Sequence, residues 1–574
     1  MKRCPECRRD YFDDTLRFCL DDGAELLEGP AQEDAATALL PGGITSETPT
    51  RFLQHSPNSR DDSPRPGSPS VRSAIFSDRR PLVIFAAVAI LAVGGFLWYA
   101  YSPFVRAKQI DSIAVMPFVN ESGNPEMDYL SDGITESLIN SLSKVPNIAV
   151  KARSSVFHYK GKQVSPQQLA NELSVQAILT GRITQRGDRI LSSLELIDAA
   201  TGNNLWGEQY DRKQTDLTVL QTDIARDVSN ELRSKLTGAE QQRVSKNYTE
   251  NTEAYQLYLK GRFHWNKRSG ADIRKSLDYF QKAIEKDPGY ALAYAGLADA
   301  YLLLPGYANE PHQAAFPKAR AAAAKALEID DTLAEAHTAL AAYTSDYEWN
   351  FPQAAAGFKR AIHLNPNYAT AHHWYAESLA AQGRFAEALA EMKRAQEIDP
   401  LSLIINGLLG VMFRLNGEFD LALEQLHRTL EMDPNFHRTH IYLAETYEAK
   451  QMFIEAGDEF HRAFILAGLP AEEADRLRDA SRQALRRDGP VGYYRKQAEL
   501  IAERRNSKKG AVPPLTVEAK YLVLSGQHEE AIKLLEQGFK DHDPDMLRLR
   551  DPALQPLRSK PRYQELLRQM GISV

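Results

Sequence analysis

The spacing of apolar residues along the chain changes character at about residue 250. Before it, from residue 110 to 235, short apolar runs alternate with segments in which apolar residues recur every three or four positions, as Ile134, Leu138 and Leu142 do. We expect strands at 113–119, 148–151, 177–184, 189–198 and 204–210, and helices at 129–142, 166–173 and 216–236. This order predicts an α/β domain with a mixed sheet and a core of its own.

Beyond residue 250 the helical spacing continues, and a longer period is added to it. Pro366, Pro400 and Pro434 recur at intervals of 34 residues, and each closes a segment with small residues at fixed offsets. Ala376 and Gly410 stand where the two helices of one unit cross, and only small residues let the backbones approach there. Because one helical hairpin cannot cover its own apolar face, several copies must stack. The pattern predicts an all-α superhelix of hairpins over residues 251–470.

These units resemble tetratricopeptide repeats. The resemblance implies a concave groove, lined by the first helix of each repeat, that binds partner proteins or peptides. The side chains expected in that groove are Tyr343, His373, Glu377, Arg414 and Glu445. Their mixed charges argue against nucleic acid, which selects a uniformly basic surface. The alternative for each of them is a solvated or packed side chain without a binding role.

The last segment, residues 471–574, departs from this period. The apolar spacing still predicts helices there, and Ala519, Gly526 and Ala531 repeat part of the earlier pattern. We therefore predict a helical extension that contains one further repeat-like unit.

A different pattern precedes the α/β region. Residues 82–101 form an uncharged apolar run of about twenty residues, which is the length of a membrane-spanning helix. Arginines are more frequent before this run than basic residues are after it, which favours a cytoplasmic N-terminus. The pattern predicts one transmembrane helix at 81–101, with the C-terminal domains outside the cytoplasm, in the inner membrane of a bacterium.

All three cysteines of the chain lie within its first nineteen residues. Cys4 and Cys7 form a Cys-x2-Cys pair, and with Cys19 and Asp22 they resemble a zinc ribbon whose fourth thiolate is replaced by a carboxylate, which can also bind zinc. We predict a zinc-ribbon-like module over residues 1–27 with one structural zinc; the alternative is a disordered tail. Residues 28–80 are rich in proline and serine, which predicts a disordered linker.

Residues 110–235 carry a second resemblance. The segments IAVMPFVNESGNPEMDYLSDGITESLINSLSKVPNIAVKARSS, ILTGRI and LELIDAATGNNLWGEQYDR are similar to the TolB amino-terminal-like (FlgO-type) domain of bacterial proteins. That family often places this domain between a membrane helix and tetratricopeptide repeats, with a kinase, cyclase or winged-helix module in the cytoplasm. The chain has no phosphate loop, kinase catalytic loop or nucleophile elbow, so we predict that it is not an enzyme.

Composition adds little that is specific to this picture. A quarter of the residues are charged and the net charge is −7, so no global bias towards nucleic acid or anionic lipid is present. The sequence predicts a membrane-anchored scaffold that binds partner proteins through its repeats. Two alternatives are a transmembrane receptor that couples outside binding to the cytoplasmic zinc module, and an enzyme whose residues follow no recognised motif.

Overall fold

The computed structural model describes residues 110–145, 147–232, 237–308, 310–507 and 514–573, together with three two-residue strands near the N-terminus. The chain divides into two compact units, Met1–Ser102 and Pro103–Val574. In the first unit, the described strands β1 (Lys2–Arg3), β2 (Asp10–Tyr11) and β3 (Leu27–Glu28) form an antiparallel sheet in the order β2-β1-β3. Cys4, Cys7, Cys19 and Asp22 lie outside the described residues, so the zinc module stays a prediction.

The prediction that the chain is a single-pass protein of the bacterial inner membrane is contradicted. None of the helices that the structure describes is both long enough and apolar enough to cross a membrane. Helix α19 (Ala471–Ser507) is interrupted by a kink at Gly489 and carries charged residues throughout, and α10 (His312–Ile329) packs its buried alanines against α9 (Ala291–Ala308). Apolar side chains of these helices such as Ala319 and Leu477 are buried within the protein itself. The predicted span at 81–101 lies outside the described residues.

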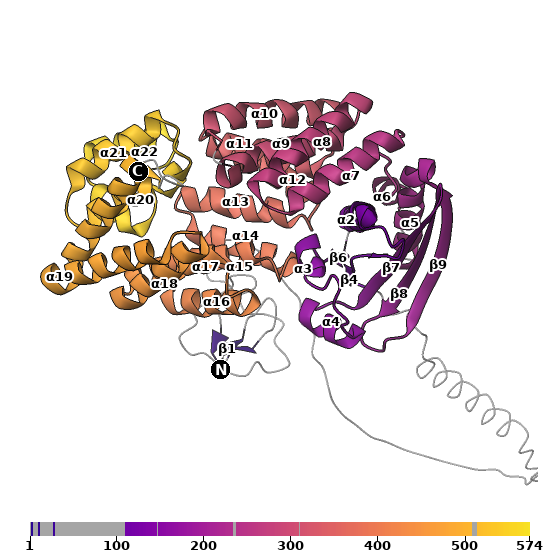
Figure 1. Ribbon diagram of the computed structural model, residues 1–574, viewed down its shortest axis with the longest axis horizontal. Helices are drawn as coiled ribbons and strands as arrows, with labels where there is room; N and C mark the ends of the chain where they lie inside the picture. The colour runs from indigo at the N-terminus through magenta and orange to yellow at the C-terminus, as the bar shows by residue number, and fades with distance from the viewer. Residues whose placement is uncertain are drawn as a thin grey trace, which may run out of the picture. The chain divides into compact units, whose positions relative to one another are not determined.

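The second unit begins with the predicted mixed sheet, whose strand order is β6-β4-β7-β8-β9, with β5 paired to β7 (Figure 1). Strands β4, β5, β6 and β7 pair in parallel, whereas β7, β8 and β9 form an antiparallel meander. The strands are β4 (Ser112–Val115), β5 (Val119–Asn120), β6 (Ala149–Val150), β7 (Ala177–Arg186), β8 (Arg189–Asp198) and β9 (Asn204–Lys213). The helices around them are α2 (Asp128–Leu142), α3 (Arg153–Phe157), α4 (Pro166–Leu173), α5 (Leu217–Leu232) and α6 (Gly238–Val244), with 3-10 turns η1 (Pro125–Met127) and η2 (Gln214–Asp216).

The predicted repeats follow as helical hairpins, which confirms the helical superhelix. The six pairs are α7 (Thr252–Asn266) with α8 (Gly270–Lys286), α9 with α10, α11 (Ala334–Asp346) with α12 (Phe351–Leu364), α13 (Ala369–Ala381) with α14 (Phe385–Ile398), α15 (Leu403–Leu415) with α16 (Phe419–Met432), and α17 (His437–Ala449) with α18 (Phe453–Leu466). Gly410 shows why small residues recur, since a Cβ there would lie 2.6 Å from Cγ of Leu426 on the second helix of the same hairpin.

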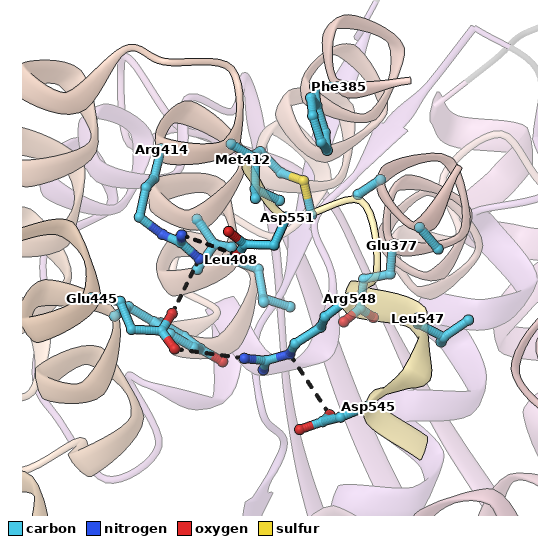
Figure 2. Close-up of a pocket in the computed structure, with 15 residues that line it drawn as sticks. Glu377, Phe385, Leu408, Met412, Arg414, Glu445, Asp545, Leu547, Arg548 and Asp551 are labelled. Carbon is cyan, nitrogen blue, oxygen red and sulfur yellow. Dashed lines mark hydrogen bonds and ion pairs between the residues drawn. The ribbon is translucent and has the colours of Figure 1, made fainter. Parts of the chain in front are cut away.

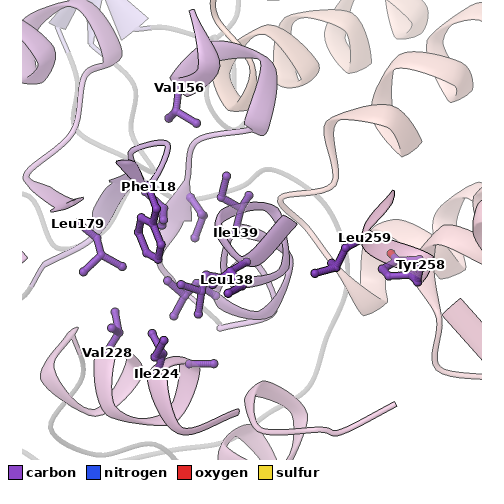
Figure 3. Close-up of a cluster of buried hydrophobic side chains, with 14 of the residues drawn as sticks. Phe118, Leu138, Ile139, Val156, Leu179, Ile224, Val228, Tyr258 and Leu259 are labelled. Carbon is purple, nitrogen blue, oxygen red and sulfur yellow. The ribbon is translucent and has the colours of Figure 1, made fainter. Parts of the chain in front are cut away.

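The α/β region and the first repeats share one core. Helix α2 lies between the sheet and α7, and the buried cluster of Figure 3 runs from Phe118 and Leu138 to Tyr258 and Leu259 on α7. At Gly133 on α2, an added Cβ would lie 2.9 Å from Cβ of Leu259. The side chain of Leu259 therefore packs directly on the backbone of α2 at Gly133, with no room for a larger residue.

The last part of the chain packs back onto the middle repeats. After α19, the C-terminal unit (residues 514–573) comprises α20 (Leu515–Leu524), α21 (His528–Lys540), η3 (Pro544–Arg548), η4 (Pro552–Leu557) and α22 (Pro561–Gln569). Its buried side chains form one cluster with Trp349, Phe351 and Ala381 from α11–α13 and the loops between them. Trp349 stacks on Phe539 and on His542 with ring centroids 4.9 Å apart in both pairs. The sequence does not predict this contact.

Candidate functional site

Three of the five predicted groove residues line one cavity. Glu377 on α13, Arg414 on α15 and Glu445 on α17 face a cavity of about 170 Å³ (Figure 2). They come from the first helices of three successive repeats, and we call the side of the superhelix that these first helices present the inner face. The repeat period brings them together because it places equivalent positions of neighbouring hairpins side by side.

The other two predicted residues lie elsewhere. Tyr343 is buried in an aromatic cluster, with its ring centroid 5.5 Å from that of Tyr347 and 6.5 Å from that of Phe316. His373 is buried one turn before Glu377, with Nε2 3.1 Å from a carboxylate oxygen of Glu377. Neither residue lines the cavity.

The opposite wall of the cavity comes from the C-terminal unit. Asp545, Leu547 and Arg548 of η3 and Asp551 after it face the repeat helices (Figure 2). Sequence reasoning missed these residues because they follow the last repeat and obey no period. The alternation of acidic and basic residues in DPDMLRLRDP is a visible signal, but it does not indicate which charges they meet.

Ion pairs connect the two walls. Arg414 lies 3.1 Å from Glu445 and 3.4 Å from Asp551, and Arg548 lies 3.6 Å from Glu445. Burial alone would raise the pKa of Glu445, but the neighbouring Lys520, Arg414 and Arg548 outweigh it and lower the pKa. Glu445 therefore stays ionised between three cations.

A second carboxylate of α17 holds the C-terminal unit in place. Glu448 is 4 % exposed and accepts hydrogen bonds from the hydroxyls of Tyr493 (3.1 Å) and Tyr521 (2.9 Å) and from Lys520 (3.3 Å). Burial raises the pKa of Glu448 despite the cation. These bonds join α17, α19 and α20.

The floor of the cavity is apolar. The apolar lining consists of aliphatic, thioether and aromatic groups from α13, α14 and α15: Ala380, Ala381, Phe385, Leu408, Met412 and, partly exposed at the opening, Val411 and Leu415. On the rim, the side chains of Glu377 and Asp545 are 43 % and 26 % exposed. An apolar floor with a charged rim suits the recognition of an amphipathic group.

At the first repeats the inner face is covered by α2. Glu136 on α2 is buried and lies 2.6 Å from Arg262 of α7 and 3.0 Å from Arg153, and it accepts a hydrogen bond from Asn266. Burial would raise the pKa of Glu136, but the two guanidinium groups outweigh it and lower the pKa. Asp299 on α9 lies 3.6 Å from Arg262. Burial raises the pKa of Asp299 to about 7.

Two family models match parts of the chain. Residues 350–402 match the tetratricopeptide repeat, and residues 108–227 match the second domain of HilA/YgeH-like transcriptional regulators. The first match confirms the repeats. The second match relates the α/β region to a different family from the TolB-like domain. The resemblance to the TolB-like domain stays a prediction. Neither model spans half of the chain.

A curated relative is the "Putative adenylate cyclase 3" of Rhizobium meliloti (strain 1021). It is 36% identical over 236 residues, which are 40% of this chain and 39% of the relative. The alignment therefore spans about two fifths of the length of the relative.

Solved structures with similar folds include two tetratricopeptide proteins. TTC0263 of Thermus thermophilus is 20% identical and covers 34% of this chain and 98% of its own, with a TM-score of 0.29. YrrB, described as having an unusual peptide-binding site, is 23% identical, and the match covers 34% of this chain and 97% of YrrB, with a TM-score of 0.25. The tetratricopeptide family model, rather than these low TM-scores, identifies the repeats.

Proposed function

We propose that this protein is an interaction scaffold that binds partner proteins at the inner face of its tetratricopeptide repeats. The observation that carries the proposal is the convergence of Glu377, Arg414 and Glu445 from three successive repeats on one cavity. Tetratricopeptide repeats are a family whose members bind protein or peptide partners. Stacked hairpins suit this role because each repeat adds side chains to one continuous surface.

The character of the cavity also supports binding. Its charged groups pair with one another across the cavity and the floor offers aliphatic and aromatic carbon. Such a surface gains affinity by burying an apolar group and gains specificity from the charges around it.

The test is site-specific photo-crosslinking in cells that express the chain. A benzophenone amino acid in place of Leu415, which lies at the cavity, should give adducts of discrete mass with partner proteins. The matched control places the same group at Lys359, an exposed position on the second helix of its hairpin. Adducts that are identical from both positions, or absent from both, would refute the proposal.

The name of the curated relative is the observation that points to an enzyme instead. We infer a binding role because the aligned residues cover only 39% of that relative and the tetratricopeptide repeat is a binding fold. Incubation of the purified chain with ATP and Mg²⁺ or Mn²⁺ should yield no cyclic AMP above a boiled sample. Sustained production of cyclic AMP would overturn this inference.

For the N-terminal unit, we propose one structural zinc ion held by Cys4, Cys7, Cys19 and Asp22. The support is the Cys-x2-Cys spacing and the preference of zinc for thiolate and carboxylate ligands. The purified chain should contain about one zinc per molecule by elemental analysis, and Cys4→Ser should contain far less. A zinc content that the substitution leaves unchanged would exclude these ligands.

A further inference from the structure

We propose that the cavity between α13, α15, α17 and η3 receives one bulky apolar side chain of a partner segment in which a neighbouring residue is lysine or arginine. The inference rests on the proposed function and specifies the chemistry of the partner. Three features of the cavity carry it: its volume, the charge of its rim and its fixed outer wall.

The volume fits a single large side chain. An apolar cavity of about 150 Å³ accommodates benzene, so about 170 Å³ accommodates the side chain of leucine, methionine or phenylalanine. Leu408, Met412 and Tyr442 are almost fully buried below it, whereas Val411 and Leu415 are partly exposed at its opening. An apolar side chain that enters here exchanges water for carbon contacts on several sides.

The rim favours a cation. Six charged side chains line the cavity, namely four carboxylates (Glu377, Glu445, Asp545 and Asp551) and two guanidinium groups (Arg414 and Arg548). Both guanidinium groups are engaged with Glu445, and Arg414 is also engaged with Asp551. Glu377 and Asp545 remain accessible at the opening, with Arg548 at 3.7 Å from Asp545. A lysine or arginine beside the inserted side chain meets this net negative rim, whereas an acidic residue is repelled.

The outer wall is built into the fold. Met546 and Leu549, on either side of Arg548, are at most 1 % exposed, and the hydroxyl of Tyr563 donates a hydrogen bond to the carbonyl oxygen of Leu549. The residues that face the cavity therefore project from a packed segment. Residues 545–551 lie across part of the inner face. The cavity therefore has room for one side chain of a short extended partner segment. An open groove, by contrast, would hold a whole helix.

A peptide display experiment tests the inference with a defined probe. Random twelve-residue peptides on phage are selected against the full chain, and enriched peptides are synthesised with a fluorophore for anisotropy measurements. We expect a consensus with a bulky apolar residue next to lysine or arginine. Val411→Trp, which fills the cavity, should weaken binding at least tenfold, and Glu377→Lys should weaken it about tenfold at low salt and less at high salt.

The controls are Leu421→Trp and Glu431→Lys, which make the same kinds of change at exposed positions of α16 and should leave the affinity unchanged. Glu377→Lys is a surface change and keeps the test decisive if Val411→Trp does not fold. If enriched peptides bind but neither cavity variant weakens them, the inference is wrong while the scaffold function stands. If no peptide is enriched and the cavity crosslinker captures no partner, both are wrong.

Discussion

The two ends of the inner face are both covered by other parts of the same chain, but in different ways. At the first repeats, α2 lies directly on α7, and Gly133 approaches Leu259 so closely that no side chain fits between them. At the later repeats, η3 and Asp551 after it meet α13, α15 and α17 through charged side chains and leave a cavity of about 170 Å³. Ion pairs occur at both places, so ion pairs alone do not distinguish a structural contact from a binding site. What distinguishes them is whether the contact leaves a cavity between the elements.

The largest effect is expected at Glu136, a buried carboxylate that pairs with two guanidinium groups and accepts a hydrogen bond from Asn266. Glu136→Gln removes the carboxylate that pairs with both Arg153 and Arg262, and leaves Arg262 with the more distant Asp299, at 3.6 Å. Breaking a buried pair in this way costs about 3–5 kcal/mol in the free energy of unfolding. Urea denaturation followed by circular dichroism measures the change. Glu431→Gln, on the exposed side of α16, should stay within about 0.5 kcal/mol of the parent chain, and an equally small effect of Glu136→Gln would show that α2 is not held by these pairs.

The next effect depends on pH. Burial raises the pKa of Asp299 to about 7, above the ordinary value of an aspartate in the unfolded chain. The folded state therefore binds the proton more tightly, and the stability that this contributes is complete at acid pH and is lost as the pH rises towards 7. Between pH 5 and pH 7 the loss amounts to about 2–3 kcal/mol, since each pKa unit corresponds to about 1.4 kcal/mol.

Asp299→Asn removes this dependence because the amide stays neutral. Unfolding free energies of the parent chain and the variant, measured from pH 5 to pH 8, should diverge in favour of the variant as the pH rises. Parallel curves would mean that Asp299 is ionised in the folded protein throughout this range.

The same comparison explains which parts of the structure can be predicted from the sequence. The repeats and Glu377, Arg414 and Glu445 are predictable because each hairpin packs on its neighbours and a fixed period records that packing. The contact between Trp349 and Phe539 leaves no period, since it joins segments far apart in the chain. Nor does the apolar spacing of α2 reveal that this helix packs against the sheet on one side and against α7 on the other. The outer wall of the cavity and the coverage of the first repeats therefore become visible only in three dimensions.

A smaller effect tests the tightness of the α2 contact. Gly133→Ala places a Cβ 2.9 Å from Leu259, which forces α2 away from α7. We expect a net loss of about 1–2 kcal/mol, because overpacking costs about 1–3 kcal/mol and the higher helix propensity of alanine offsets part of it. The pair Gly133→Ala and Leu259→Gly, which removes the opposing Cβ, should recover stability relative to the sum of the single effects in a double-mutant cycle. Additive losses would indicate that the two residues do not press on each other.

The smallest effect is expected where added volume finds space. Val411→Leu adds one methylene group at the opening of the cavity, where the walls are formed by side chains from separate elements. Its free energy of unfolding should lie within about 0.5 kcal/mol of the parent value, in contrast to the loss that one methyl group causes at Gly133. Thermal and urea unfolding of both variants under the same conditions measure the difference. Equal losses at the two positions would mean that the later repeats are packed as tightly as the first, and the cavity could then not serve as the seat of a partner side chain.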